Sequence, residues 1–230
     1  MLKKDLLHEH QHGAGHECGD LKTELMTHFP YGVFSVALGF IGVAIMDYFS
    51  FGATREVVQE GAHVLFHTFH FLHIVFAATG VMLTYFRFSK NLLKGIVIGA
   101  SSTIIFCVLS DILLPYICGM VLGVPMRLHV CFVSELHNVL PFLVIGMING
   151  WVLSQHPEEM QGYYSVWSHF AHIFVSSVAS LLYMVSHGFG SWQGHMGPLF
   201  LSLIFAVVFP CTMSDVVVPM YFAKGKGKRC

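Results

Sequence analysis

Residues 63–85 read HVLFHTFHFLHIVFAATGVMLTY. The stretch is apolar enough to cross a bilayer, yet it contains His63, His67, His70 and His73. At about 100° per helical residue these imidazoles fall within roughly 120° of arc, so they form a stripe along one helix face. Ionisable groups at membrane depth are energetically expensive and usually belong to a pathway or a site. The stripe therefore predicts a functional element inside a membrane span.

The composition of the whole chain is that of a membrane protein. Its 230 residues are 55% hydrophobic and 11% charged, and the mean hydropathy is +0.67. Soluble domains carry about 25% charged residues. Segments long and apolar enough to span a bilayer are 29–50, 62–86, 95–119, 130–153, 164–186 and 197–222. We therefore expect an all-α polytopic membrane protein with six transmembrane helices.

The basic residues predict the orientation. With six spans both termini share one side, together with the loops after the second and fourth spans. That side holds 10 of the 12 basic residues, and only Arg55 and Arg127 lie on the other. Because basic residues accumulate on the cytoplasmic side, we expect both termini in the cytoplasm, in a bacterial inner membrane. Membrane lipid and metal ions are the expected partners, with no nucleic acid and with a homodimer left open.

Three short patterns occur once in each half of the chain, in the same order. The first pattern is Glu24-Leu25 followed by Pro30, which recurs as Glu135-Leu136 followed by Pro141. The second is His70-Phe-Leu-His73, which recurs as His169-Phe-Ala-His172. The third is Cys107-Val-Leu-Ser110-Asp111 followed by Pro115, which recurs as Cys211-Thr-Met-Ser214-Asp215 followed by Pro219. Ordered matches of this kind indicate an internal duplication of three spans each. Because three is odd, the second copy enters the membrane in the opposite direction, which predicts a 3+3 inverted repeat, an architecture common among transporters.

The repeat divides the chain into four parts. These are a His-rich cytoplasmic tail (1–28), a first three-helix repeat (29–123), a second three-helix repeat (124–223) and a basic cytoplasmic tail (224–230). The first tail contains LLHEHQHGAGHECGD, and short His-rich tracts bind borderline metals. We expect this tail to have an accessory role.

Span directions assign the candidate ligands to two layers. The outer layer is His70, His73, Asp111 and Glu135, with His67 and His137 in reserve, and the inner layer is His169, His172, Asp215 and Glu24, with His28 in reserve. At 1.5 Å per residue the layers should lie on the order of 10 Å apart. His63, His129, His187 and His195 lie near the outer surface, where an interfacial role fits as well as a functional one.

These side chains suit a divalent transition-metal cation. Histidines at i and i+3 share a helix face, and a carboxylate from another helix can complete the shell. Imidazole with carboxylate favours zinc, iron, manganese, cobalt or nickel, and the nearby Cys107 and Cys211 tilt the choice toward zinc. Because Pro115 and Pro219 lack an N–H, we also expect them to free the carbonyls of Asp111 and Asp215.

The resulting hypothesis is a membrane transporter for a divalent transition metal, best matched by zinc, rather than an enzyme. The first alternative is an intramembrane metalloenzyme with zinc or a diiron centre, although no HExxH motif lies within the six spans and no GxSxG motif is present. A bis-His haem protein is less favoured, because the two His pairs are expected at opposite depths.

Overall fold

The structure is a computed structural model that describes residues 21–190 and 192–224, without the side chains of residues 21–25, 27–28, 158–167 and 224. The His-rich stretch 1–20 and most of the basic tail therefore lie outside the described residues. The described part of the chain is all-helical and contains no strand. It has six helices long and apolar enough to cross a membrane, so the predicted fold class is confirmed.

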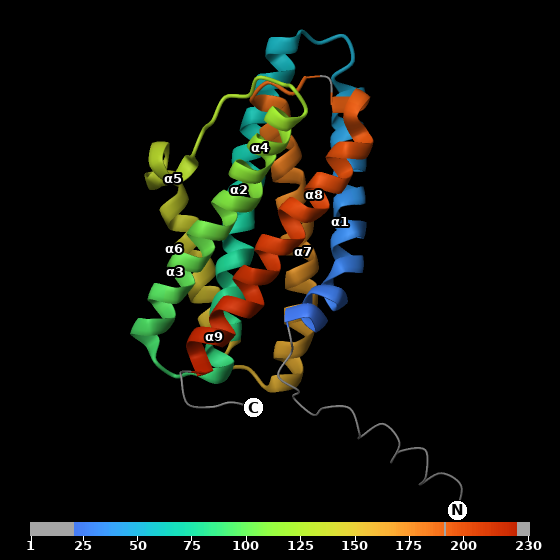
Figure 1. The fold of residues 1–230 in the computed structure, drawn as a ribbon. Helices are drawn as coiled ribbons and strands as arrows, with labels where there is room; N and C mark the ends of the chain where they lie inside the picture. Colours follow the sequence, from blue (N-terminus) through green and yellow to red (C-terminus); the bar gives the residue numbers. More distant parts are fainter. Residues whose placement is uncertain (1–20, 191, 225–230) are drawn as a thin grey trace, which may run out of the picture.

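Several of the spans consist of more than one helix. The helices are α1 (Leu21–Phe49), α2 (Arg55–Phe88), α3 (Leu92–Val108), α4 (Leu114–Val121), α5 (Cys131–Ser134), α6 (Leu136–Leu153), α7 (Glu158–Ser186), α8 (Met196–Thr212) and α9 (Val218–Lys224) (Figure 1). A π-helical segment, Leu109–Leu113, joins α3 to α4, and a second one, Met213–Val217, joins α8 to α9. A 3₁₀ turn, Trp192–His195, precedes α8.

Local sequence sets several helix ends. Asn91 caps α3, because its side-chain oxygen accepts a hydrogen bond from the backbone N–H of Lys94 at 3.0 Å. Gly123 follows α4 with φ +79°, and Gly188 follows α7 with φ +132°. Only glycine adopts such angles without strain, so these two residues let the chain turn sharply after each helix.

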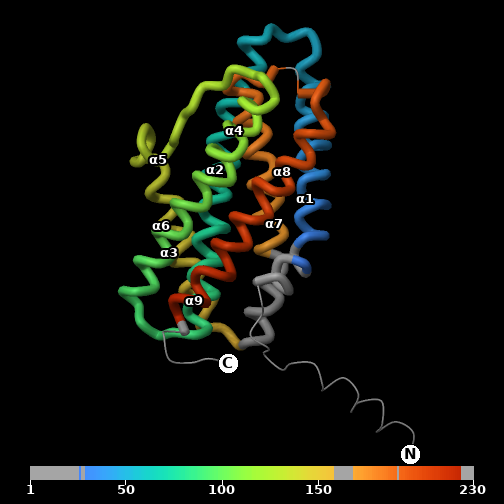
Figure 2. The backbone as a smooth tube through the Cα atoms, in the orientation of Figure 1, coloured from blue at the N-terminus to red at the C-terminus, as the bar shows by residue number. Residues whose placement is uncertain are grey.

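Helices α2 and α7 run antiparallel through the middle of the bundle, and the other spans surround them (Figures 1 and 2). The span within α7 is the most deeply buried of the six. The peripheral helices expose apolar side chains such as Ile45, Ile145 and Leu201, as expected where helices face lipid. The start of α1 and the end of α9 lie at the same end of the bundle (Figure 1).

Small residues bring α6 against α2. A Cβ atom added at Gly146 would lie 2.6 Å from the backbone oxygen of Val75, and one added at Gly150 would lie 2.5 Å from that of Thr79. The Thr79 hydroxyl also donates to the carbonyl of Gly146 at 3.1 Å. Such small residues one turn apart allow close helix contact in membranes, and this contact fixes one side of α2.

Candidate metal centre

A cluster of eight potential ligands lies in the middle of the bundle. This central cluster consists of His70 and His73 from α2, Cys107 and Asp111 from the α3–α4 span, His169 and His172 from α7, and Cys211 and Asp215 from the α8–α9 span. None of these residues is more than 7% exposed. Ionisable side chains are this deeply buried only where they satisfy one another or hold an ion.

Asp111 is held by four donors. Its Oδ2 atom lies 2.8 Å from Nδ1 of His70 and 2.6 Å from Nδ1 of His73. Its Oδ1 atom accepts hydrogen bonds from the hydroxyls of Ser110 at 3.0 Å and Ser176 at 2.6 Å. The first predicted trio, two histidines and one aspartate, is therefore brought together, and a serine from α7 completes it.

Asp215 gathers the second predicted trio. Its Oδ2 atom lies 2.6 Å from Nδ1 of His172 and 3.5 Å from Nδ1 of His169. Its Oδ1 atom is buried and has no hydrogen-bond partner among the described residues. The second carboxylate is therefore paired with its histidines but less fully bonded than Asp111.

The two trios are in direct contact, which the expected spacing of about 10 Å between two layers did not anticipate. Nε2 of His73 lies only 2.6 Å from Nε2 of His172. The thiol sulfurs of Cys107 and Cys211 each lie 3.9 Å from the same Nε2 atom of His73. The sequence estimate treated the helices as independent rods, whereas the contact between α2 and α7 brings the inner members of the two pairs together.

The aspartates orient the histidines toward this meeting point. A carboxylate only accepts hydrogen bonds, so the Nδ1 atoms of His73 and His172 carry the protons and their Nε2 atoms face each other. Two neutral imidazoles in this tautomer would oppose their lone pairs at 2.6 Å, so the pair requires a shared proton or a cation. The aspartates thus occupy the position from which carboxylates support metal-bound histidines.

The donor separations can be compared with those of a tetrahedral metal site. With Zn–N and Zn–S bonds of usual length, two imidazole nitrogens on one ion lie about 3.3 Å apart, and a nitrogen and a sulfur about 3.6 Å apart. The observed separations are 2.6 Å between the Nε2 atoms and 3.9 Å from each sulfur to His73. One ion would require the imidazoles to separate by about 0.7 Å. His73, His172 and Cys211 all offer atoms within 4.8 Å of one another, and Cys107 lies beside them.

Both aspartates lie on the π-helical segments. In the first segment the N–H of Leu114 bonds to the carbonyl of Leu109, five residues back. In this π-helical spacing the N–H that Pro115 lacks would have bonded to the carbonyl of Ser110. Pro115 therefore leaves that carbonyl without its helical donor, whereas in an α-helix it would have been the carbonyl of Asp111. The hydroxyl of Ser180 bonds to that carbonyl at 3.1 Å.

The second segment repeats this arrangement. The N–H of Val218 bonds to the carbonyl of Met213, and Pro219 leaves the carbonyl of Ser214 without a helical donor. That carbonyl accepts a hydrogen bond from the hydroxyl of Ser102 at 3.4 Å. In both halves, therefore, the proline frees the carbonyl one residue before the aspartate, and a serine from another helix bonds to it.

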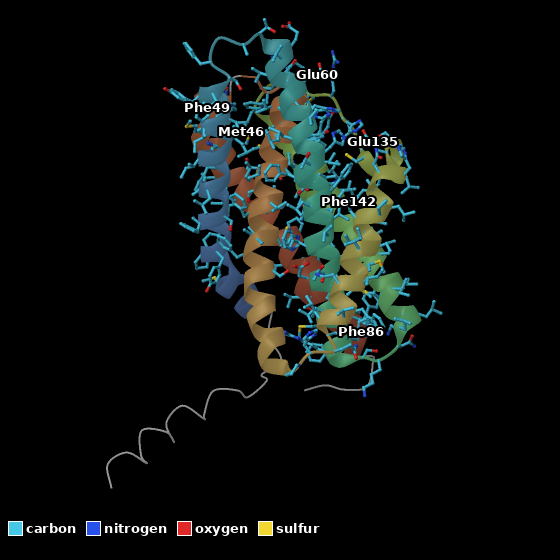
Figure 3. All side chains as sticks on the ribbon, turned by 180° about the vertical axis from the view of Figure 1, so that it is seen from behind. Met46, Phe49, Glu60, Phe86, Glu135 and Phe142 are labelled. Carbon is cyan, nitrogen blue, oxygen red and sulfur yellow. The ribbon has the colours of Figure 1, made fainter. Side chains whose placement is uncertain are left out.

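Glu135 pairs with His67 rather than with Asp111, in the half of the bundle that also holds Glu60 (Figure 3). The short helix α5 ends at Ser134, and the next residue, Glu135, has a φ of −131° and a ψ of 34° that interrupt the helix before α6. Its carboxylate lies 3.1 Å from Nε2 of His67 and 3.9 Å from Nε2 of His129. Nitrogen atoms of His63, His67 and His129 all lie within 4.8 Å of one another. We call His63, His67, His129 and Glu135 the second histidine group.

His187, at the end of α7, lies next to this group. Its ring stacks on that of Tyr183 at 4.2 Å and lies 5.7 Å from that of His129. Burial lowers the pKa of His187 to about 4, and burial together with the nearby His67 lowers the pKa of His129. Both imidazoles are therefore predominantly neutral at neutral pH, which is the metal-binding form.

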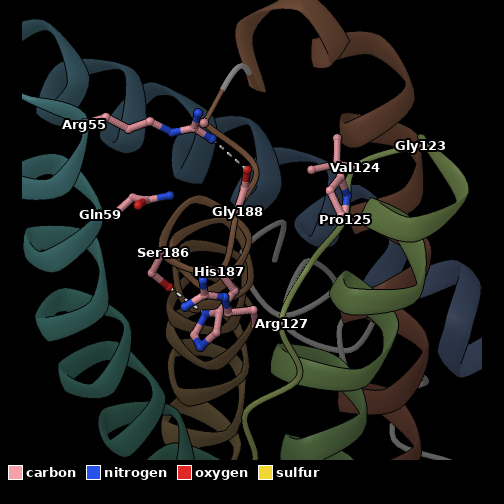
Figure 4. Close-up of a pocket in the computed structure, with 10 residues that line it drawn as sticks. Arg55, Gln59, Gly123, Val124, Pro125, Arg127, Ser186, His187 and Gly188 are labelled. Atoms are coloured by element: carbon pink, nitrogen blue, oxygen red, sulfur yellow. Dashed lines mark hydrogen bonds between the residues drawn. The ribbon is translucent and has the colours of Figure 1, made fainter.

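A cavity of about 580 Å³ lies beside His187. Arg55, Gln59 and Arg127 also line it, and the Arg55 guanidinium donates to the carbonyl of Gly188 at 3.3 Å (Figure 4). A second cavity of about 230 Å³ lies between α1, α2 and α7. No member of the central cluster lines either cavity.

Other predicted site residues lie outside both groups or outside the described side chains. His137 is exposed on the first turn of α6. The backbone of Glu24 and His28 belongs to α1, but their side chains are not among those described. Ser176 was not predicted, although the serines at positions 176, 177 and 180 form an unusually polar run for an apolar span.

Comparisons with protein-family models, with curated proteins and with solved structures find no match to this chain. The fold and the site define it as a polytopic membrane protein with a buried His/Asp/Cys cluster. Groups of these residues are positioned so that they could hold a metal ion.

Proposed function

We propose that this protein transports a divalent transition-metal cation, with zinc as the best candidate. One observation carries the proposal: Nε2 of His73 and Nε2 of His172 face each other at 2.6 Å, and two thiol sulfurs each lie 3.9 Å from Nε2 of His73. Two imidazoles and one or two thiolates form a donor set typical of zinc, and softer donors of this kind disfavour manganese.

The arrangement of the two halves supports transport rather than a static metal site. Each half contributes a His pair, a cysteine and an aspartate on a π-helical segment, in the same order along the chain. The antiparallel α2 and α7 bring the two contributions to one place. This fits the 3+3 inverted repeat, in which a central site alternates between the two sides of the membrane.

The proposal includes the orientation of the chain. The start of α1 and the end of α9 share one end of the bundle (Figure 1), and the topology predicted from the sequence assigns 10 of the 12 basic residues to that side. We assign that end to the cytoplasm by the positive-inside rule. The His-rich tail would then gather or receive ions on the cytoplasmic side.

Flux measurements test the proposal. The protein would be reconstituted in proteoliposomes, and uptake of zinc, manganese, cobalt, nickel and iron(II) measured for the parent, Asp111→Ala and Asp215→Ala. We expect zinc flux in the parent and a reduction of about 10–100-fold in each variant, because both carboxylates orient the facing imidazoles. Ser177→Ala is the matched control, since its hydroxyl donates to the carbonyl of Ile173 in its own helix rather than to an aspartate. Equal flux in the parent and both aspartate variants would contradict the proposal.

A resident metal in an intramembrane enzyme is the second candidate. The enclosure of the central cluster favours it, because neither cavity is lined by a residue of the cluster. Tight metal binding without flux for any ion of the panel would support this candidate. A haem held between His73 and His172 does not fit, since 2.6 Å between their Nε2 atoms leaves no room for the macrocycle.

A further inference from the structure

The second histidine group forms a meeting point of chemically similar side chains from three separate parts of the chain. His63 and His67 come from the first half of α2, His129 from the connection before α5, and Glu135 from the break between α5 and α6. Nothing in the proposed central site requires these residues to converge. Nevertheless, nitrogen atoms of the three histidines lie within 4.8 Å of one another, and the carboxylate lies 3.1 Å from His67.

Hydrogen bonds to the backbone and to a neighbouring tyrosine hold the group in place. Nδ1 of His67 lies 2.9 Å from the carbonyl of His63, and a carbonyl only accepts, so Nδ1 carries the proton and Nε2 is left to face Glu135. The backbone N–H of His129 donates to the Tyr183 hydroxyl at 3.1 Å, and this hydroxyl donates to the carbonyl of Arg127 at 3.2 Å. Tyr183 thereby fixes the connection that carries His129 against α7.

The accessibility of this group differs from that of the central cluster. The side chains of His67, His129 and Glu135 are 12%, 26% and 27% exposed, whereas those of His73 and Asp111 are 1% and 0% exposed. Three imidazoles and one carboxylate also form a set without sulfur. An ion can therefore reach this group directly from the surface, and meets only nitrogen and oxygen donors there.

We propose that the second histidine group is a separate site for a divalent transition-metal ion, held by His63, His67, His129 and Glu135. Three imidazoles with a carboxylate satisfy the four-coordinate preference of zinc and offset one of its two charges. His67, the member of the group nearest to His70, lies about one helical turn before it. His63 and His67 therefore lie on the face of α2 that leads to the central cluster. The inference concerns binding only, and holds whether or not the protein transports metal.

Residue-resolved histidine modification tests this site in the full chain. The detergent-solubilised protein would be treated with diethyl pyrocarbonate over a range of ZnCl₂ concentrations, and each histidine followed by mass spectrometry. We expect zinc to slow the modification of His63 and His129 about 10-fold or more, because their nitrogens become ligands. His156 is an internal control, since its Nδ1 atom also lies near a carbonyl four residues back, at 3.1 Å, but at the opposite end of the bundle.

Two variants decide whether the residues share one ion. Glu135→Gln should raise the zinc concentration for half-protection of His63 and His129 by about 10-fold or more, and His67→Gln should remove their protection together. Unchanged protection in both variants, or equal protection of His156, would show that no shared site exists. Asp111→Ala should leave this protection intact. Protection at His63 and His129 without zinc flux would therefore contradict the transport proposal while supporting this one.

Discussion

Asp111 and Asp215 occupy the same place in their sequence patterns, but their surroundings differ. Asp111 accepts from two histidines within 2.8 Å and from two serine hydroxyls, so both of its oxygens are bonded. Asp215 has one histidine at 2.6 Å and another at 3.5 Å, and its Oδ1 atom has no hydrogen-bond partner among the described residues. The comparison shows that the same motif yields a fully bonded carboxylate in one half and a partly bonded one in the other.

The partner helix explains much of the difference. Ser176 in α7, seven residues after His169, donates to Asp111 at 2.6 Å. The corresponding residue in α2, seven after His70, is Ala77, which has no hydroxyl to offer Asp215. Oδ1 of Asp215 can therefore accept a proton or a metal ion without losing an existing bond, whereas any such step at Asp111 must break one.

The largest expected effect is on stability when each carboxylate is neutralised. Asp111→Asn should lower the free energy of unfolding of the metal-free protein by about 3–5 kcal/mol, since it removes a buried charge bonded to two histidines. Asp215→Asn should lower it by about 1–3 kcal/mol, because fewer bonds to the charge are lost. Thermal unfolding in detergent with a chelator measures both. A larger loss for Asp215→Asn would reverse the comparison.

The next effect isolates the serine that distinguishes the two halves. Ser176→Ala should destabilise the protein by about 1.5–3 kcal/mol, because the lost hydrogen bond ends on a charged oxygen. Ser177→Ala is the matched control, with a neighbouring buried hydroxyl that donates to the neutral carbonyl of Ile173 at 2.7 Å, and should cost about 0.5–1.5 kcal/mol. The same unfolding assay compares them, and equal losses would mean that the charged acceptor adds nothing.

Much of the fold and of the central cluster could be predicted because both depend on helix periodicity. Long apolar segments predicted the six spans, and the i, i+3 spacing placed His70 with His73 and His169 with His172 on shared faces. The aspartates were assigned to the correct pairs because span directions fix their depth. These predictions required only local geometry and the order of the spans.

The predictions from the sequence that differ from the structure are those that depend on how the helices contact one another. The pairing of α2 with α7 brings His73 against His172, and no spacing within one helix encodes that contact. The π-helical register moved the freed carbonyl by one residue, a shift that the proline alone does not specify. Glu135 turns toward His67 because the chain breaks between α5 and α6, whereas a continuous span was expected from residue 130.

The smallest expected effect tests whether packing against α2 holds the carboxylate of Asp215 in its position. A Cβ atom added at Gly80 in α2 would lie 2.7 Å from Oδ2 of Asp215, the oxygen that faces His172. Gly80→Ala should therefore displace Asp215 and destabilise the protein by about 1–2 kcal/mol, with weaker metal binding at the central cluster.

Gly42→Ala in α1 provides the matched comparison, because an added Cβ atom there meets nothing within 4 Å. This variant should be unchanged or more stable by up to about 1 kcal/mol, the gain expected from alanine over glycine in a helix. Zinc titration and thermal unfolding of both variants separate the two cases. If Gly80→Ala behaved like Gly42→Ala, Asp215 would have room to move without loss, and its position would be set by its histidine bonds alone rather than by the close approach of α2.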